Sequence, residues 1–285
     1  MAGQYNPSRR PGTKVALLRG FPTPNVRERS RTSIITPRIR MARPFLRSSN
    51  PALSPARFRD ASGEGVMTVA GTAWRSLVLL LLVIGSAAYT WWQLAPDPTA
   101  APTYVMGASI GGLVIALVTM FRPRLAPWTS PVYAVVEGMA LGSLSLLVNA
   151  AYAGLPMQAV ALTFGVFLAM LALYALRIVK VTQRLRAFIM SAVLGILLFY
   201  ALNLVLGLFG VRIPAIHEGG PIGIGVSLFT TGIAALALLL DFDLIEQGAE
   251  AGAPKFMEWY GAFGLLVTLV WLYVEILNLL RKLRD

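Results

Sequence analysis

Seven long apolar segments alternate with short polar connections over most of the chain. Each segment approaches the roughly 20 residues that a helix needs to cross the hydrocarbon core of a bilayer. No strand pattern competes with this reading, and the short connections predict antiparallel neighbours in one bundle. The sequence therefore predicts an all-α integral membrane protein with seven transmembrane helices. The expected spans are residues 76–94, 104–121, 132–152, 157–176, 187–210, 222–240 and 261–280.

The composition supports a membrane protein over a soluble domain. Hydrophobic residues make up 56% of the chain and charged residues 13%, whereas soluble domains have about 25% charged residues. The chain has no cysteine and a single histidine, so disulfides, thiolate chemistry and His/Cys metal sites are excluded as organising features. It shows no nucleophile elbow, phosphate-binding loop or zinc helix, and we do not expect an enzyme.

The basic charge is concentrated in an N-terminal tail. Residues 1–60 contain 13 of the 25 Lys and Arg residues and 2 of the 13 Asp and Glu residues, a balance of +11, while the rest of the chain balances at +1. We expect residues 1–60 to be disordered and residues 61–285 to form the membrane domain. The tail suits anionic lipids better than nucleic acid, because no aromatic residues interleave with the arginines. Met41 is an alternative start.

The basic residues of the short connections predict the orientation, because Lys and Arg accumulate on the cytoplasmic side. We therefore expect a cytoplasmic N-terminus in a plasma or inner membrane, and an outer C-terminus after seven spans. The basic residues at the C-terminus argue against an outer C-terminus, so a re-entrant seventh segment with a cytoplasmic tail is an alternative. The connections on the expected cytoplasmic side contain Arg122, Arg124, Arg177, Lys180, Arg184 and Arg186, and the C-terminus contains Arg281, Lys282 and Arg284.

Glu275 stands inside the last apolar segment. A carboxylate in the middle of a membrane helix costs about 3 kcal/mol on insertion scales, so it normally faces a partner, a cavity or a pathway. Its neighbours at helical spacing carry no positive charge, so a partner must come from another helix. Thr268, Glu275, Asn278 and Lys282 share one helical face, which we expect to point into the bundle.

Other acidic residues are candidates for a buried role. Asp241 follows an unbroken run of Ile, Ala and Leu, and it is buried if the sixth helix continues past it, whereas Asp243 is read as part of a solvated helix end. Glu137 lies inside the third span without a charged neighbour and needs either an interhelical partner or contact with water. Gly138 and Gly142 are spaced for close helix packing.

Several motifs together resemble the Bax inhibitor-1 family of transmembrane Bax inhibitor motif proteins, in its bacterial branch with an N-terminal extension. The resemblance covers roughly residues 48–285, and the order of the motifs on seven spans is more specific than any one of them. The motifs are Ser-Asn-Pro-Ala-Leu at 49–53, Met-Thr-Val-Ala-Gly-Thr at 67–72, Glu-Gly-Met-Ala-Leu-Gly at 137–142, Asp-Phe-Asp-Leu-Ile at 241–245 and Tyr-Val-Glu-Ile-Leu-Asn-Leu at 273–279.

The resemblance implies a bundle with the last helix at its centre and a calcium leak that responds to pH. It places Asp241 and Glu275 in a carboxylate pair that senses pH, and Arg122 as an arginine that can lock this pair. The seventh-helix acid is Glu here, where the family has Asp. Calcium is expected as a permeant ion that Asp241 and Glu275, with Asn278 in support, bind weakly and transiently, and no cofactor is expected to bind tightly.

The proposed pair has a physical basis and a geometric difficulty. Two carboxylates in close contact inside a bundle share a proton and titrate as a unit. A helix that begins at Trp259, however, puts Glu275 about 24 Å from its cytoplasmic end, too far out to contact Asp241 unless the span begins later or the sixth helix is offset.

Two other functions stay open, namely a non-transporting regulator of a protease or stress response, with a membrane protein partner, and a proton-coupled small-solute transporter.

Overall fold

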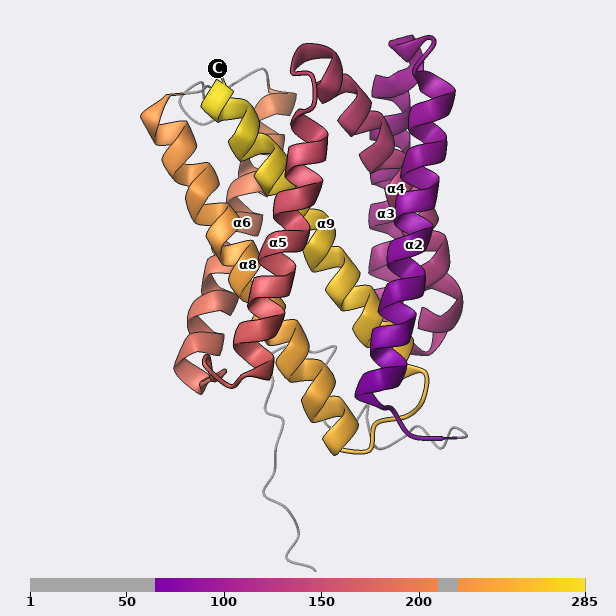
Figure 1. Ribbon diagram of the computed structural model, residues 1–285, viewed down its shortest axis with the longest axis vertical. Helices are drawn as coiled ribbons and strands as arrows, with labels where there is room; N and C mark the ends of the chain where they lie inside the picture. The colour runs from indigo at the N-terminus through magenta and orange to yellow at the C-terminus, as the bar shows by residue number, and fades with distance from the viewer. Residues whose placement is uncertain (1–64, 210–219, 285) are drawn as a thin grey trace, which may run out of the picture. The chain divides into compact units, whose positions relative to one another are not determined.

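The computed structural model describes residues 65–209 and 220–284, which form seven long α-helices joined by short connections (Figure 1). All seven are long and apolar enough to cross a membrane, as the sequence predicts. The basic tail and residues 210–219 lie outside the described residues. The helices are α2 (Val69–Leu94), α3 (Ala101–Phe121), α4 (Ala126–Ala151), α5 (Leu155–Ala175), α6 (Gln183–Leu208), α8 (Pro221–Glu250) and α9 (Met257–Arg284).

Most of the helices extend beyond the spans that the apolar pattern predicts, and the extension is clear in α2, α8 and α9. Thr68 caps α2, accepting a 2.9 Å hydrogen bond from the Gly71 N–H, so this helix begins seven residues before the expected span. The helix α8 continues ten residues past residue 240, and α9 begins at Met257. Because α9 is one uninterrupted helix that ends opposite its start (Figure 1), the re-entrant alternative is wrong.

The last helix lies at the centre of the bundle, as expected. It packs against α2, α4, α5 and α8, while α3 packs mainly on α4 and α6 on α8. Its core positions are apolar, for example Leu266 and Leu272. A buried 2.6 Å hydrogen bond between the hydroxyls of Tyr273 and Ser145 also joins α9 to α4. A central α9 brings its polar side chains into contact with several neighbouring helices.

Two glycines of α4 allow close approach to α2, as their spacing predicts. A Cβ atom built on Gly138 would lie 1.8 Å from the Ser86 hydroxyl oxygen, and one built on Gly142 would lie 2.4 Å from the carbonyl oxygen of Ala87. Both distances are shorter than any van der Waals contact, so only glycine fits. In lipid no hydrophobic effect drives helices together, and small residues at such crossings allow the close van der Waals packing that does.

Candidate functional site

Glu275 is buried in the bundle, with 2% of its surface exposed. Three donors from three helices surround its carboxylate. The Tyr200 hydroxyl of α6 donates to Oε1 at 2.6 Å, the Thr230 hydroxyl of α8 donates to Oε2 at 2.7 Å, and the Trp271 indole N–H of α9 donates to Oε1 at 3.1 Å. All three groups donate to Glu275, which suits a carboxylate anion, since an ionised carboxylate can only accept hydrogen bonds. The hydrogen-bond donors that reach Glu275 from other helices are thus neutral hydroxyl groups.

The polar stripe of α9 faces α8. Thr268, Glu275 and Lys282 are seven residues apart, two helical turns, so they lie one above another on the same face. Thr268 lies beside Asp241 of α8, and Lys282 donates to the Ser227 hydroxyl at 2.8 Å and to a carbonyl oxygen near the start of α8. Lys282 is also buried. The stripe therefore points into the bundle, as the sequence predicts, and forms a buried polar line along the α8–α9 interface.

Asp241 lies inside α8, and its Oδ2 atom is enclosed without a hydrogen-bond partner among the described residues. An enclosed carboxyl oxygen without a donor is costly, by about 1–3 kcal/mol, and more for a charged group. The helix continues past Asp241, as a buried role for this residue requires. The residue as a whole is half-buried, and its Oδ2 atom is the part that is shielded from solvent without a donor.

The two carboxylates of the expected pair lie on the same interface at different levels. Asp241 lies beside Thr268, whereas Glu275 lies beside Thr230. Thr268 precedes Glu275 by seven residues, which corresponds to about 10 Å along the helix. No hydrogen bond joins Asp241 to Glu275. The early start of α9 explains the separation, because it puts Glu275 far from the beginning of the helix. The sequence predicts this separation for a helix that begins near residue 259.

The other candidate residues lie apart from this interface or at its edge. Arg122 is exposed at the end of α3, and no ion pair of the described residues joins it to Asp241 or Glu275. Glu137 is half-buried, with Oε2 2.6 Å from where a Cβ of Gly112 would be, so it packs on α3. Asn278 is half-buried on α9.

The interpretation of Asp243 as part of a solvated helix end is wrong. Asp243 pairs with Arg186 at the start of α6, and it accepts a 2.6 Å hydrogen bond from the Gln247 side chain. One turn further along α8, Glu246 pairs with Arg177. These contacts hold the last turns of α8 against the connection between α5 and α6, which explains why α8 continues beyond its apolar segment.

A cluster of polar contacts around Glu258 is not predicted by the apolar pattern. Glu258 is fully buried in the first turn of α9, where it pairs with Arg75 of α2 and accepts a 2.9 Å hydrogen bond from Lys255. Its Oε1 also accepts from the backbone N–H and the hydroxyl of Thr68, at 2.8 and 2.9 Å. Glu258 therefore ties the start of α9 to the start of α2. The sequence contains one sign of this cluster, since Glu258 is an acid in the first turn of a helix and follows Lys255 by three residues.

No group of three or more His, Cys, Asp or Glu side chains that could hold a metal ion occurs within the described ranges 65–209 and 220–284. The acidic residues of the α8–α9 interface are spread along the helices.

Comparison with known proteins places the chain in a family. A family model described as "Bax inhibitor 1 like" matches residues 28–285, which include all seven helices. No curated protein and no solved structure matches the chain. Because the family model covers most of the sequence, this multi-pass membrane protein belongs to the Bax inhibitor 1 like family.

Proposed function

We propose that the protein is a proton-regulated calcium leak channel whose conductance is controlled by Glu275 and Asp241. The observation that carries the proposal is the Glu275 site, a buried carboxylate in a membrane helix that accepts hydrogen bonds from α6, α8 and its own helix. Carboxylates at this depth are costly and normally serve a pathway or a proton relay. The resemblance to Bax inhibitor proteins supports calcium as the ion.

The Glu275 site couples protonation to helix packing. As an anion, the carboxylate holds Tyr200 of α6 and Thr230 of α8 against the central helix. A proton on Glu275 would remove the charge that these hydroxyl groups bind, and each hydrogen bond to a charged group contributes about 1.5–3 kcal/mol. Protonation therefore weakens the contacts of α6 and α8 with α9, and these two helices are the moving elements of the proposed gate.

Asp241 contributes from the other level of the same interface. The levels of the two residues differ by seven residues of α9, about 10 Å along the helix axis, and two unit charges at such a distance interact by roughly 2 kcal/mol at an effective dielectric constant of 20. The charge of one carboxylate therefore acts on the other without direct contact. The proposed sensor differs in this respect from the touching pair that the resemblance implies. A lock by Arg122 would need a movement of the end of α3 and has no part in the gate proposed for this conformation.

Calcium flux into liposomes, measured against pH, tests the proposal. Glu275→Gln and Asp241→Asn are the test variants, and each is expected to flatten the pH dependence of the flux. Asp97→Asn is the matched control. The hydroxyl and N–H of Thr99 hold the pKa of Asp97 below its ordinary value, so this exposed carboxylate stays ionised at physiological pH and its loss leaves the pH profile unchanged.

Flux that is independent of pH and identical in all variants would overturn the proposal. If in addition no flux exceeds that of empty liposomes, the protein does not conduct calcium, and a non-transporting regulator becomes the better reading. A change in pH profile for Asp97→Asn equal to that for Glu275→Gln would show that the response comes from surface charge and would also count against the Glu275 gate.

A further inference from the structure

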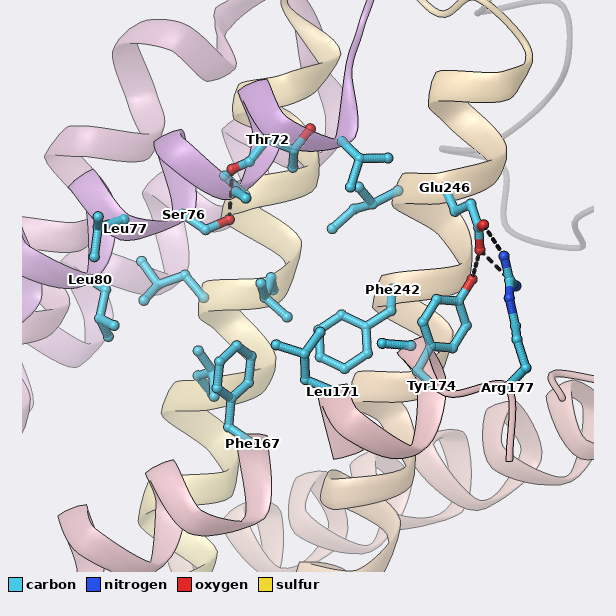
Figure 2. Close-up of a pocket in the computed structure, with 18 residues that line it drawn as sticks. Thr72, Ser76, Leu77, Leu80, Phe167, Leu171, Tyr174, Arg177, Phe242 and Glu246 are labelled. Atoms are coloured by element: carbon cyan, nitrogen blue, oxygen red, sulfur yellow. Dashed lines mark hydrogen bonds and ion pairs between the residues drawn. The ribbon is translucent and has the colours of Figure 1, made fainter. Parts of the chain in front are cut away.

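A groove of about 430 Å³ opens between α2 and α5, with residues of α8 and α9 completing its lining. Figure 2 shows apolar side chains from both sides, including Leu77 and Leu80 of α2 and Phe167 and Leu171 of α5. The helices that line the groove are long and apolar enough to cross a membrane. Neither Asp241 nor Glu275 lines it, so it is a separate site from the proposed gate.

The groove continues toward the middle of the bundle. A smaller hollow of about 130 Å³ shares Leu80, Leu266 and Leu269 with it and follows α2 as far as Ala87. The larger groove alone follows α2 from Val69 to Leu80, which corresponds to about 16 Å of helix. Half of a bilayer core about 30 Å thick has the same depth. The groove thus has the length of an acyl chain in one leaflet.

The outer end of the groove is polar. There the Arg177 guanidinium pairs with Glu246, which also accepts a hydrogen bond from Tyr174 (Figure 2). Glu246 raises the pKa of Arg177 further above its ordinary value, so the guanidinium is a cation at every relevant pH. Its side chain is 61% exposed, and two of its five N–H donors suffice for the contacts with Glu246. The remaining donors can bind a further acceptor.

The chain that follows this end is basic and exposed. Lys180 and Arg184 come three and seven residues after Arg177, both exposed, with no acidic residue between them. Because Glu246 is neutralised by Arg177, these two residues give the connection that follows the polar end of the groove an excess of positive charge. Basic residues next to a membrane surface each contribute about 1 kcal/mol to the binding of anionic lipid.

We propose that the groove binds one anionic phospholipid, with an acyl chain between α2 and α5 and the phosphate at Arg177, Lys180 and Arg184. The apolar lining excludes a polar solute, and the basic end selects a negative headgroup. This site is independent of the leak channel proposed above. It differs from ordinary lipid contact because residues of the central helix α9, such as Leu265, line it together with three other helices.

Photo-crosslinking of the full-length protein in detergent tests the site. The probe is phosphatidylglycerol with a photoactivatable acyl chain, compared with the matching phosphatidylcholine, and mass spectrometry locates the label. We expect phosphatidylglycerol to label groove residues of α2, α5 and α9. Leu171→Trp should fill the groove and lower this labelling roughly tenfold, a loss of about 1.4 kcal/mol of binding free energy. Leu77→Trp fills it from α2 and serves if Leu171→Trp does not fold.

Leu168→Trp is the matched control, because Leu168 is 59% exposed on α5 and does not line the groove. It should leave the labelling unchanged. For the headgroup, the double variant Lys180→Ala with Arg184→Ala should lower the preference for phosphatidylglycerol by roughly tenfold or more, while Arg124→Ala in another connection should not. Label spread evenly over all exposed helices, equal labelling by both lipids, or equal loss in Leu171→Trp and Leu168→Trp would overturn the proposal.

Discussion

The hydroxyl of Thr230 in α8 donates a 2.7 Å hydrogen bond to Oε2 of Glu275 in α9. Both side chains are buried, with 2% of each residue exposed. The neighbouring Thr231 has an enclosed hydroxyl oxygen without a partner among the described residues. Thr231 is half-buried. Of these two adjacent threonines, only Thr230 therefore binds the buried carboxylate.

Thr230→Val is expected to destabilise the protein by about 1.5–3 kcal/mol, the contribution of a hydrogen bond to a charged group. Thr231→Val removes a polar group that has no partner, so it should be neutral or slightly stabilising. Thermal unfolding of the two variants in the same detergent makes the comparison. Equal losses of stability would mean that the contact with Glu275 contributes nothing beyond the packing of a threonine.

Asp241 and Asp243 make a second matched pair on α8. Asp241 has an enclosed oxygen without a donor, whereas Asp243 is paired with Arg186. Asp241→Leu should therefore raise the stability by about 1–3 kcal/mol, the cost of an unsatisfied buried group, and abolish the pH response of calcium flux. A protein that keeps an unfavourable buried carboxyl keeps it for function.

Asp243→Leu should instead lower the stability, because it leaves Arg186 without its partner. Denaturant unfolding in mixed micelles measures both changes, and calcium flux is recorded on the same samples. A loss of stability in Asp241→Leu that matches the loss in Asp243→Leu would contradict the assignment of Asp241 as an unsatisfied group.

Glu258→Ala is expected to cost about 3 kcal/mol or more, since removal of one partner of a buried ion pair leaves the other charge without compensation. The variant loses the contacts to Arg75, Lys255 and Thr68 together. Glu250→Ala, at the exposed end of α8, is the control and should stay within about 0.5 kcal/mol of the parent. Limited proteolysis near the start of α2 provides a second readout and should accelerate only in Glu258→Ala.

Gly142→Ala is expected to destabilise the contact between α2 and α4, because the new methyl group meets the backbone of Ala87 and cannot be relieved by a change of rotamer. Overpacking of this kind typically costs about 1–3 kcal/mol. Gly165→Ala in α5 has open space around the new Cβ and should stabilise the helix by up to about 1 kcal/mol. Melting temperatures of the two variants should therefore move in opposite directions.

The apolar pattern alone was sufficient to predict the fold class and the number of spans. Lipid offers no hydrogen bonds to the backbone, so an apolar segment of sufficient length has few alternatives to a helix. The same pattern located the polar face of α9, because the positions of Thr268, Glu275 and Lys282 repeat every two turns of one helix. The donor Trp271 stands one turn from Glu275, and its hydrogen bond could have been inferred from that spacing.

Tertiary structure decided which groups meet across helices. Tyr200 and Thr230 reach Glu275, and Arg75 reaches Glu258, from positions far away in the sequence. Helical periodicity determines the face on which a residue lies, but it contains no information about the offset of one helix along its neighbour. An offset of one turn moves a side chain by about 5.4 Å, more than the length of a hydrogen bond. The sequence by itself therefore determined the helices and their buried acids, and only the packing of α8 on α9 decided that Asp241 and Glu275 occupy separate levels.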